Sequence, residues 1–147
     1  MELTHEMKEK MLGGLWGAVV GDALGVPVEF MTREEVRSDL VTGMRGFGTF
    51  KLPAGSWSDD SSLLLCTADS LLHGFDLNDM ANRFTRWYSE GLWTPYGKAF
   101  DIGNATRAAI SRLKRGISPE LAGGDSEGDN GNGSLMRIMP VAVSFQK

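Results

Sequence analysis

Small and apolar residues recur at helical spacing along much of the chain, and no stretch of convincing length alternates between apolar and polar residues as a strand does. The spacing predicts helices over residues 7–25, 58–74, 78–91, 103–115 and 134–143. Glycine and proline interrupt the pattern in residues 31–57 and again in residues 116–134, and we expect irregular segments there. The sequence therefore predicts an all-α fold.

Capping residues mark the ends of several predicted helices. Ser58 and Asn78 are good N-cap residues, and Gly91 and Gly116 follow the last apolar positions of two helices, where glycine often stops a helix. Pro140 should kink or end the last helix, because proline lacks the backbone N–H that a helix interior needs.

Glycine is unusually frequent, with 19 glycines among 147 residues. The first predicted helix carries one at every fourth position, so that four of them share a face: Gly13, Gly17, Gly21 and Gly25. Each glycine weakens a helix by about 1 kcal/mol relative to alanine, so we expect another backbone to pack closely on this face. Pro27 should end the helix, because the residue before a proline is pushed out of helical geometry.

Composition narrows the classes of function. Fifteen lysines and arginines against nineteen acidic residues give a net charge of −4, which argues against a nucleic-acid binder. Cys66 is the single cysteine, so no disulfide can form within the chain, and the first residues do not have the pattern of a signal peptide. The charge-free apolar stretch from Met11 to Gly21 is shorter than the roughly 20 residues that cross a bilayer. We expect a cytoplasmic protein that binds neither nucleic acid nor membrane.

Two adjacent carboxylates and two hydroxyls lie at the start of a predicted helix, on Ser58, Asp59, Asp60 and Ser61. Hard cations such as Mg²⁺, Mn²⁺ and Ca²⁺ prefer oxygen ligands, and consecutive residues point in different directions, so Asp59 and Asp60 could each hold one ion of a pair. The alternative is structural. In that interpretation Ser58 caps the helix, and each acid gains about 0.3–1 kcal/mol from the helix dipole.

Two further segments could carry chemistry. Glu29 lies between apolar residues Val28 and Phe30, surroundings that suit a general acid or base, although such a residue could equally lie on the surface or cap a helix. Residues 130–134 form a glycine- and asparagine-rich loop before a predicted helix, where exposed N–H groups can bind a phosphate. Loops of this composition are otherwise most often turns.

Three motifs follow one another along the chain: Gly21-Asp22-Ala23-Leu24-Gly25-Val26-Pro27-Val28-Glu29-Phe30, Gly55-Ser56-Trp57-Ser58-Asp59-Asp60-Ser61 and Asn130-Gly131-Asn132-Gly133-Ser134-Leu135-Met136-Arg137. Their order and combination resemble the ADP-ribosylglycohydrolase family, which includes dinitrogenase-reductase-activating glycohydrolases and ADP-ribosyl hydrolases. The resemblance runs from Met11 to about Phe145. It implies a compact orthogonal bundle of α-helices with a dinuclear Mg²⁺ or Mn²⁺ centre in a cleft.

The resemblance also implies a role for each motif. Ser58, Asp59 and Asp60 would be metal ligands, and Glu29 would act with Asp59 and Asp60 in catalysis. The loop that holds the diphosphate and the distal ribose would be Asn130, Gly131, Asn132, Gly133 and Ser134. The implied reaction is metal-dependent hydrolysis of an ADP-ribosyl glycosidic linkage, which releases ADP-ribose from a modified protein side chain or a small conjugate.

One family motif is absent. Members of the family carry a second acidic motif, Asp-x-Asp-Ser/Thr, towards the C-terminus, where it completes both metal positions, and residues 1–147 lack it. We therefore expect this sequence to be the N-terminal portion of a single domain of the family. We also expect it to self-associate or to bind the C-terminal portion. The alternative is a non-catalytic relative with a structural or ADP-ribose-binding role.

Overall fold

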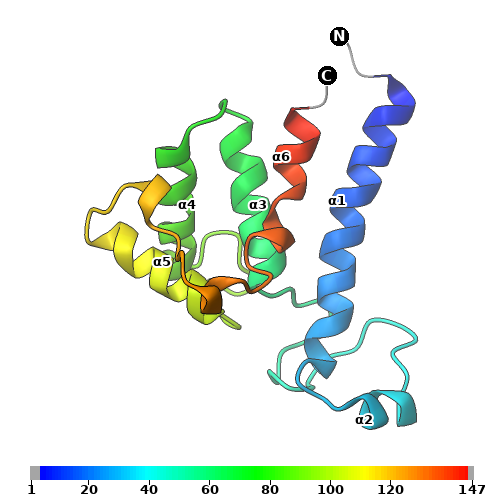
Figure 1. Cartoon of the computed structure of the whole chain (residues 1–147). Helices are drawn as coiled ribbons and strands as arrows, with labels where there is room; N and C mark the ends of the chain where they lie inside the picture. Colours follow the sequence, from blue (N-terminus) through cyan, green and yellow to red (C-terminus); the bar gives the residue numbers. More distant parts are fainter. Residues whose placement is uncertain (1–3, 146–147) are drawn as a thin grey trace. The chain divides into compact units, whose positions relative to one another are not determined.

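The computed structural model describes residues 4–145 (Figure 1), and across that range it contains α-helices and short 3₁₀ turns but no strand. The predicted all-α fold class is confirmed. Contacts divide the chain into two compact units, which we call the N-terminal unit (up to Ser58) and the C-terminal unit (from Asp59). Each unit is described by itself.

The N-terminal unit begins with the long helix α1 (His5–Gly25). The Thr4 hydroxyl caps it by accepting a hydrogen bond from the backbone N–H of Met7. The helix passes directly into the 3₁₀ turn η1 (Val26–Val28), which has Pro27 in its first turn. Pro27 therefore ends the α-helix, as its fixed backbone angle and missing N–H predict.

A second, shorter helix of this unit, α2 (Arg33–Ser38), lies where an irregular segment was predicted, so that prediction was wrong. A capping box stabilises α2. The Thr32 hydroxyl accepts from the Glu35 N–H at 3.2 Å, and the Thr32 N–H donates to the Glu35 carboxylate at 2.7 Å. The Thr-x-x-Glu spacing is visible in the sequence and was the signal for this helix.

The glycine face of α1 does not have the predicted close neighbour within the N-terminal unit. No heavy atom lies within 4 Å of the position that a Cβ would take at Gly13, Gly17, Gly21 or Gly25. Apolar side chains of the same helix are also exposed, with 51% of Leu12 and 67% of Trp16 accessible to solvent.

Residues His5–Val28 form one helical segment of 24 residues that is long and apolar enough to cross a membrane by length and composition alone. Its most apolar window has a mean hydropathy of 1.4 and is 17% buried. The sequence estimate stopped at Asp22 and was shorter, because it allowed no charged residue inside the stretch. Core helices of soluble proteins and signal sequences satisfy the same criterion.

The C-terminal unit is a small helical bundle (Figure 1). Its helices are α3 (Asp59–Leu71), α4 (Leu77–Glu90), α5 (Asn104–Lys114) and α6 (Met139–Ser144), with 3₁₀ turns η2 (Pro119–Leu121), η3 (Glu127–Asp129) and η4 (Leu135–Arg137) before α6. Helix α3 packs against α4, α6 and η4, and α4 packs against α5 and η2. The core between these helices consists of Leu63, Cys66, Trp87 and Ile110.

The ends of these helices agree with most of the predicted stop signals. Gly91 caps α4 in the left-handed conformation, with φ 75°. The N-cap of α4 is Asp76 rather than Asn78, because the Asp76 carboxylate accepts from the N–H groups of Asn78 and Asp79. Pro140 lies in the first turn of α6 and divides the predicted last helix into η4 and α6.

Candidate active site

The backbone at Glu29 is held by a loop from later in the N-terminal unit. Glu29 directly follows η1 and is half-buried. Its carbonyl oxygen accepts a hydrogen bond from the Thr49 hydroxyl at 2.6 Å, and the Thr49 N–H donates to the carbonyl of Pro27 at 3.1 Å. These two bonds fix the segment that carries the Glu29 side chain.

Gly48 makes this arrangement possible. A Cβ at Gly48 would lie 1.8 Å from the carbonyl oxygen of Pro27, so no residue other than glycine fits there without moving the backbone. Three non-glycine residues in the same part of the unit have left-handed backbones, with φ of 62°, 61° and 55° at Phe30, Phe47 and Lys51. Such conformations carry strain, and strain of this kind is concentrated at functional sites.

Ser58 is fixed by a residue to which the sequence analysis gave no role. Its backbone N–H donates to both oxygens of the Asp22 carboxylate, at 3.0 and 3.2 Å, and 4% of Ser58 is exposed. Asp22 comes from the last part of α1 and belongs to the first of the three motifs. The signal for this contact was an acidic residue in an otherwise apolar and glycine-rich stretch.

The two adjacent carboxylates lie in the first turn of α3, in the C-terminal unit. Asp59 is the first residue of the helix, which puts Ser58 at the predicted position just before it. Only 5% of Asp59 is exposed, and Asp60 is half-buried. Carboxylates at a helix N-terminus interact favourably with the helix dipole, which offsets part of the cost of burying them.

Arg137, at the end of η4, faces this end of α3. Its guanidinium lies over the ring of Phe84, 4.8 Å from the ring centroid. Burial lowers the pKa of Arg137, and the charge of the Asp59 carboxylate opposes that shift, so the two groups lie close enough to interact. Arg137 ends the third motif, but the sequence analysis gave it no role. A basic residue that follows an apolar stretch was the only signal.

The predicted phosphate loop, residues 130–134, immediately precedes η4 and is exposed except at Gly133, which is half-buried. The carbonyl of Asn132 accepts from the N–H of Met136, which joins the loop to η4. Gly133 passes very close to Thr106 of α5, since a Cβ at Gly133 would lie 3.1 Å from the Thr106 hydroxyl oxygen.

Asp129, the acidic residue directly before this loop, makes local hydrogen bonds to Ser126. The Asp129 carboxylate accepts from both the hydroxyl and the N–H of Ser126, at 2.5 and 3.3 Å. These hydrogen bonds lower the pKa of Asp129 and so favour its anionic form, which accepts hydrogen bonds within the same 3₁₀ turn.

The two units divide the predicted site residues between them. Glu29 and Ser58 belong to the N-terminal unit, whereas Asp59, Asp60 and the loop 130–134 belong to the C-terminal unit. Within the C-terminal unit, η4 connects the loop to α3, against which it packs, and so brings the loop's end to the helix that Asp59 begins. Residues 4–145 contain no group of three or more His, Cys, Asp or Glu side chains that could hold a metal ion.

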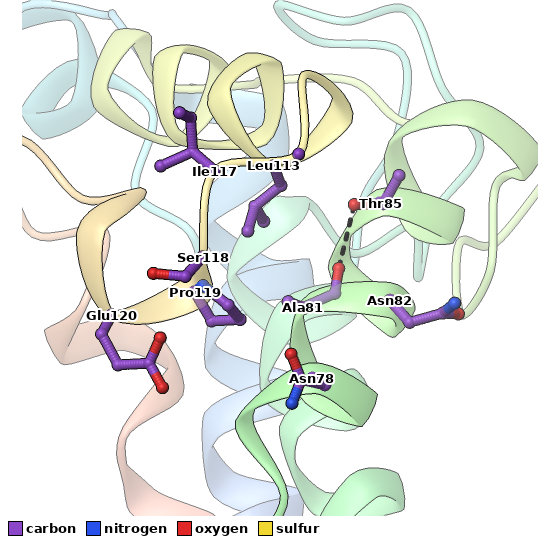
Figure 2. A pocket seen from close by; sticks show the side chains of 10 residues that line it. Asn78, Ala81, Asn82, Thr85, Leu113, Ile117, Ser118, Pro119 and Glu120 are labelled. Carbon is purple, nitrogen blue, oxygen red and sulfur yellow. Dashed lines mark hydrogen bonds between the residues drawn. The ribbon is translucent and has the colours of Figure 1, made fainter.

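A separate cavity of about 680 Å³ opens elsewhere in the C-terminal unit, between α4, the end of α5 and η2 (Figure 2). Polar side chains line much of it, including Asn78, Asn82, Thr85, Ser118 and Glu120. None of the predicted site residues belongs to it, so the cavity is distinct from the candidate active site.

A family model and a solved structure both relate this chain to ADP-ribosylglycohydrolases. A family model described as ADP-ribosylglycohydrolase matches residues 3–147. A solved structure described as an "ADP-ribosylglycohydrolase-related protein complex" superposes with a TM-score of 0.77 at 39% identity, over 95% of this chain and 44% of that chain.

Curated relatives with stated activities are also similar. ADP-ribosylarginine hydrolase Tri1 of Pseudomonas putida (strain GB-1) is 40% identical over 145 residues, which cover 96% of this chain and 38% of that protein. ADP-ribosyl-[dinitrogen reductase] glycohydrolase of Rhodospirillum rubrum is 33% identical over 141 residues, covering 92% of this chain and 45% of that protein. The chain thus spans about two fifths of the length of the curated relatives it matches.

Proposed function

The chain belongs to the ADP-ribosylglycohydrolase family, and from that premise we propose that it forms part of an enzyme that hydrolyses ADP-ribosyl linkages. The family match runs through both compact units, so we further propose that they are parts of one domain. The reaction adds water across the bond between the anomeric carbon of the ribose and the acceptor atom. It releases ADP-ribose and the unmodified acceptor.

For the acceptor we propose the guanidinium of an arginine side chain. Two relatives, at 40% and 35% identity, are named ADP-ribosylarginine hydrolases, whereas the relative named for dinitrogen reductase is 33% identical. The guanidine leaves more readily when it is protonated. An acidic side chain must therefore supply the proton that the guanidine takes up as the bond to the sugar breaks.

One structural observation supports the proposal most strongly. In the C-terminal unit, Asp59 is almost fully buried at the start of α3, and Arg137 of η4 interacts with it. The loop 130–134 leads directly into η4. The proposed diphosphate loop and a buried carboxylate are therefore joined by one short turn, an arrangement that suits a substrate with a diphosphate on one side and a reacting sugar on the other.

The donor set fits a hard divalent cation. Ser58, Asp59 and Asp60 offer oxygen atoms only, and Mg²⁺ is commonly held by one or two carboxylates together with water molecules. We propose these three residues as ligands of Mg²⁺ or Mn²⁺. Such an ion, when bound, supplies Lewis-acid activation of the ribose hydroxyls and of water.

The chain's own residues transfer the proton and bind the diphosphate. Glu29 carries the proton, which it donates to the departing acceptor atom or takes from the attacking water. The backbone N–H groups of residues 130–134 orient the diphosphate, and the hydrogen bond from Thr49 to the Glu29 carbonyl fixes the backbone that carries the Glu29 side chain. Stabilisation of positive charge on the sugar follows the logic of other glycoside hydrolyses.

A non-catalytic relative that binds ADP-ribose without hydrolysing it is the second candidate. It is favoured by the spacing of the acidic side chains, because residues 4–145 offer no cluster of three or more His, Cys, Asp or Glu side chains that could hold a metal ion. The two candidates make different predictions for the same measurement, since both bind ADP-ribose but only one turns over a conjugate.

The test is to incubate the protein with ADP-ribosylated arginine and either Mn²⁺ or Mg²⁺, and to measure released ADP-ribose by chromatography. We expect release with either ion, loss of release with excess chelator, and a loss of at least about 10²-fold in Asp59→Asn. Binding of ADP-ribose without any release would favour the non-catalytic relative. Undiminished release in excess chelator would contradict the proposed metal dependence.

A further inference from the structure

The cavity between α4, the end of α5 and η2 lies within the C-terminal unit and contains none of the residues proposed for hydrolysis. Its volume of about 680 Å³ falls within the range of roughly 300–1,000 Å³ that is usual for ligand pockets. The cavity is therefore large enough to take a ligand of its own.

The polar groups of the cavity are acceptors that the fold leaves available. Glu120 is the one charged residue among the described residues that line it. The Glu120 side chain is exposed, and its carboxylate makes no ion pair or hydrogen bond with any residue in the range 4–145. The side-chain amide of Asn78 makes none within that range either, although the Asn78 backbone N–H donates to Asp76. In the view of Figure 2 these two polar ends lie on either side of Pro119.

The basic side chains at the end of α5 are directed to other partners. The Arg112 guanidinium donates to the carbonyl of Ala122 at 3.1 Å, and the Lys114 ammonium lies 4.9 Å from the centroid of the Tyr88 ring. Arg115 donates to a backbone carbonyl four positions earlier in the chain. None of these three basic residues lines the cavity. A cationic ligand would therefore meet a carboxylate there without a competing positive charge from the described lining residues.

Apolar side chains form much of the remaining wall. Leu113 and Ile117, from the end of α5, and Pro119, from η2, line the cavity together with the polar groups. Ile117 is 43% exposed and so presents apolar surface to a ligand. An arginine side chain combines an aliphatic stem with a planar guanidinium that has five N–H donors and no acceptor. Acceptors beside an apolar wall match such a group.

We propose that this cavity binds a guanidinium group on an aliphatic stem. The Glu120 carboxylate pairs with the cation, and the side-chain oxygen of Asn78 accepts a further N–H. The net charge of −4 adds long-range attraction for a positively charged ligand. An arginine side chain of a polypeptide and a free guanidino compound carry the same group. Binding in the cavity requires none of the residues proposed for catalysis, so it is independent of hydrolysis.

The experiment titrates the protein at low ionic strength with butylguanidine and with the peptide acetyl-Gly-Arg-Gly-amide, and follows binding by calorimetry. We expect Glu120→Gln, which removes the charge at nearly constant size, to bind both probes about 10-fold more weakly. Asn78→Ala should weaken binding by about threefold. Glu127→Gln is the matched control, because Glu127 is also exposed but lies in η3, outside the cavity, and this variant should stay within about twofold of the wild type.

The comparison of probes identifies the source of the guanidinium. Tighter binding of the peptide than of butylguanidine would support an arginine of a polypeptide, and equal binding would support a free guanidino compound. Butylamine, which carries an ammonium on the same stem, should bind more weakly than butylguanidine. The inference is overturned if neither guanidinium probe binds at millimolar concentration, if Glu120→Gln binds as the wild type does, or if butylamine binds equally well. None of the probes carries ADP-ribose, so such a failure would leave the proposed hydrolysis unaffected.

Discussion

The carboxylate of Asp22 accepts the backbone N–H of Ser58 through both of its oxygens, at 3.0 and 3.2 Å, across 36 positions of sequence. The bond joins the end of α1 to the residue just before the Asp59-Asp60 pair. Hydrogen bonds with a charged acceptor are stronger than neutral ones, so the Asp22 carboxylate is a strong acceptor for the N–H that precedes α3.

Replacing Asp22 tests this relationship. We expect Asp22→Ala to lower the free energy of unfolding by about 1–3 kcal/mol, because the buried N–H of Ser58 loses its acceptor. Urea denaturation provides the measurement. Asp39→Ala is the control, since Asp39 pairs with Arg45 on an exposed surface and should change stability by less than about 1 kcal/mol. Equal losses in the two variants would show that Asp22 has no special role.

Gly48 predicts a second effect on stability. A Cβ in Gly48→Ala would overlap the carbonyl of Pro27, so the loop that anchors Glu29 must move, at a cost of about 1–3 kcal/mol or more. Gly43→Ala is the matched control, because no atom lies within 4 Å of its Cβ position. Thermal unfolding of both variants checks the prediction, which fails if Gly48→Ala unfolds at the control's temperature.

Glu29 predicts an effect on activity. Glu29→Gln keeps the size of the side chain but removes the titratable proton, so we expect turnover of an ADP-ribosyl conjugate to fall by at least about 10²-fold. ADP-ribose binding should change little. Glu34→Gln, on the exposed helix α2, provides the control. Turnover near the wild-type rate in Glu29→Gln would exclude Glu29 as the general acid or base.

Asp79 predicts how stability depends on pH. Arg83 and Ser70 donate hydrogen bonds to its carboxylate at 2.7 and 2.6 Å, and they lower the pKa of Asp79 below its ordinary value of 3.8. A carboxyl whose pKa is lower in the folded state contributes stability above its unfolded pKa, and the contribution is lost as the pH falls through the folded value. We therefore expect Asp79→Asn to reduce the difference in unfolding temperature between pH 6 and pH 3. An unchanged difference would contradict the prediction.

Cys66 predicts resistance to thiol reagents. Its side chain is fully buried in the core of the C-terminal unit, and burial raises the pKa of the thiol to about 12. Only the thiolate reacts, so at pH 8 we expect iodoacetamide to modify the folded protein at least about 10²-fold more slowly than the urea-unfolded protein. Mass spectrometry follows the reaction. Rapid modification of the folded chain would show that this core opens readily.

Local patterns determined the helical part of the structure. The apolar spacing, the proline positions and the glycine stop signals placed α1, α3, α4 and α5 within a few residues of their observed bounds, since helix formation and capping depend on neighbours three or four positions away. The same local information was available for α2, where Thr32 and Glu35 form a capping box, and for the Asp76 cap of α4. Both features depend on residues two or three positions apart and are therefore predictable from the sequence.

Residues far apart in the sequence needed the tertiary structure. The glycine face of α1 stood out in the sequence, yet the glycines that the fold requires for close packing include Gly48 against Pro27 and Gly46 against Ala54. The motifs identified Asp59 and the loop 130–134 as candidates, but not their partners. Such pairs form only when helices pack, because the packing of whole side-chain surfaces, and not local propensity, decides which distant groups meet.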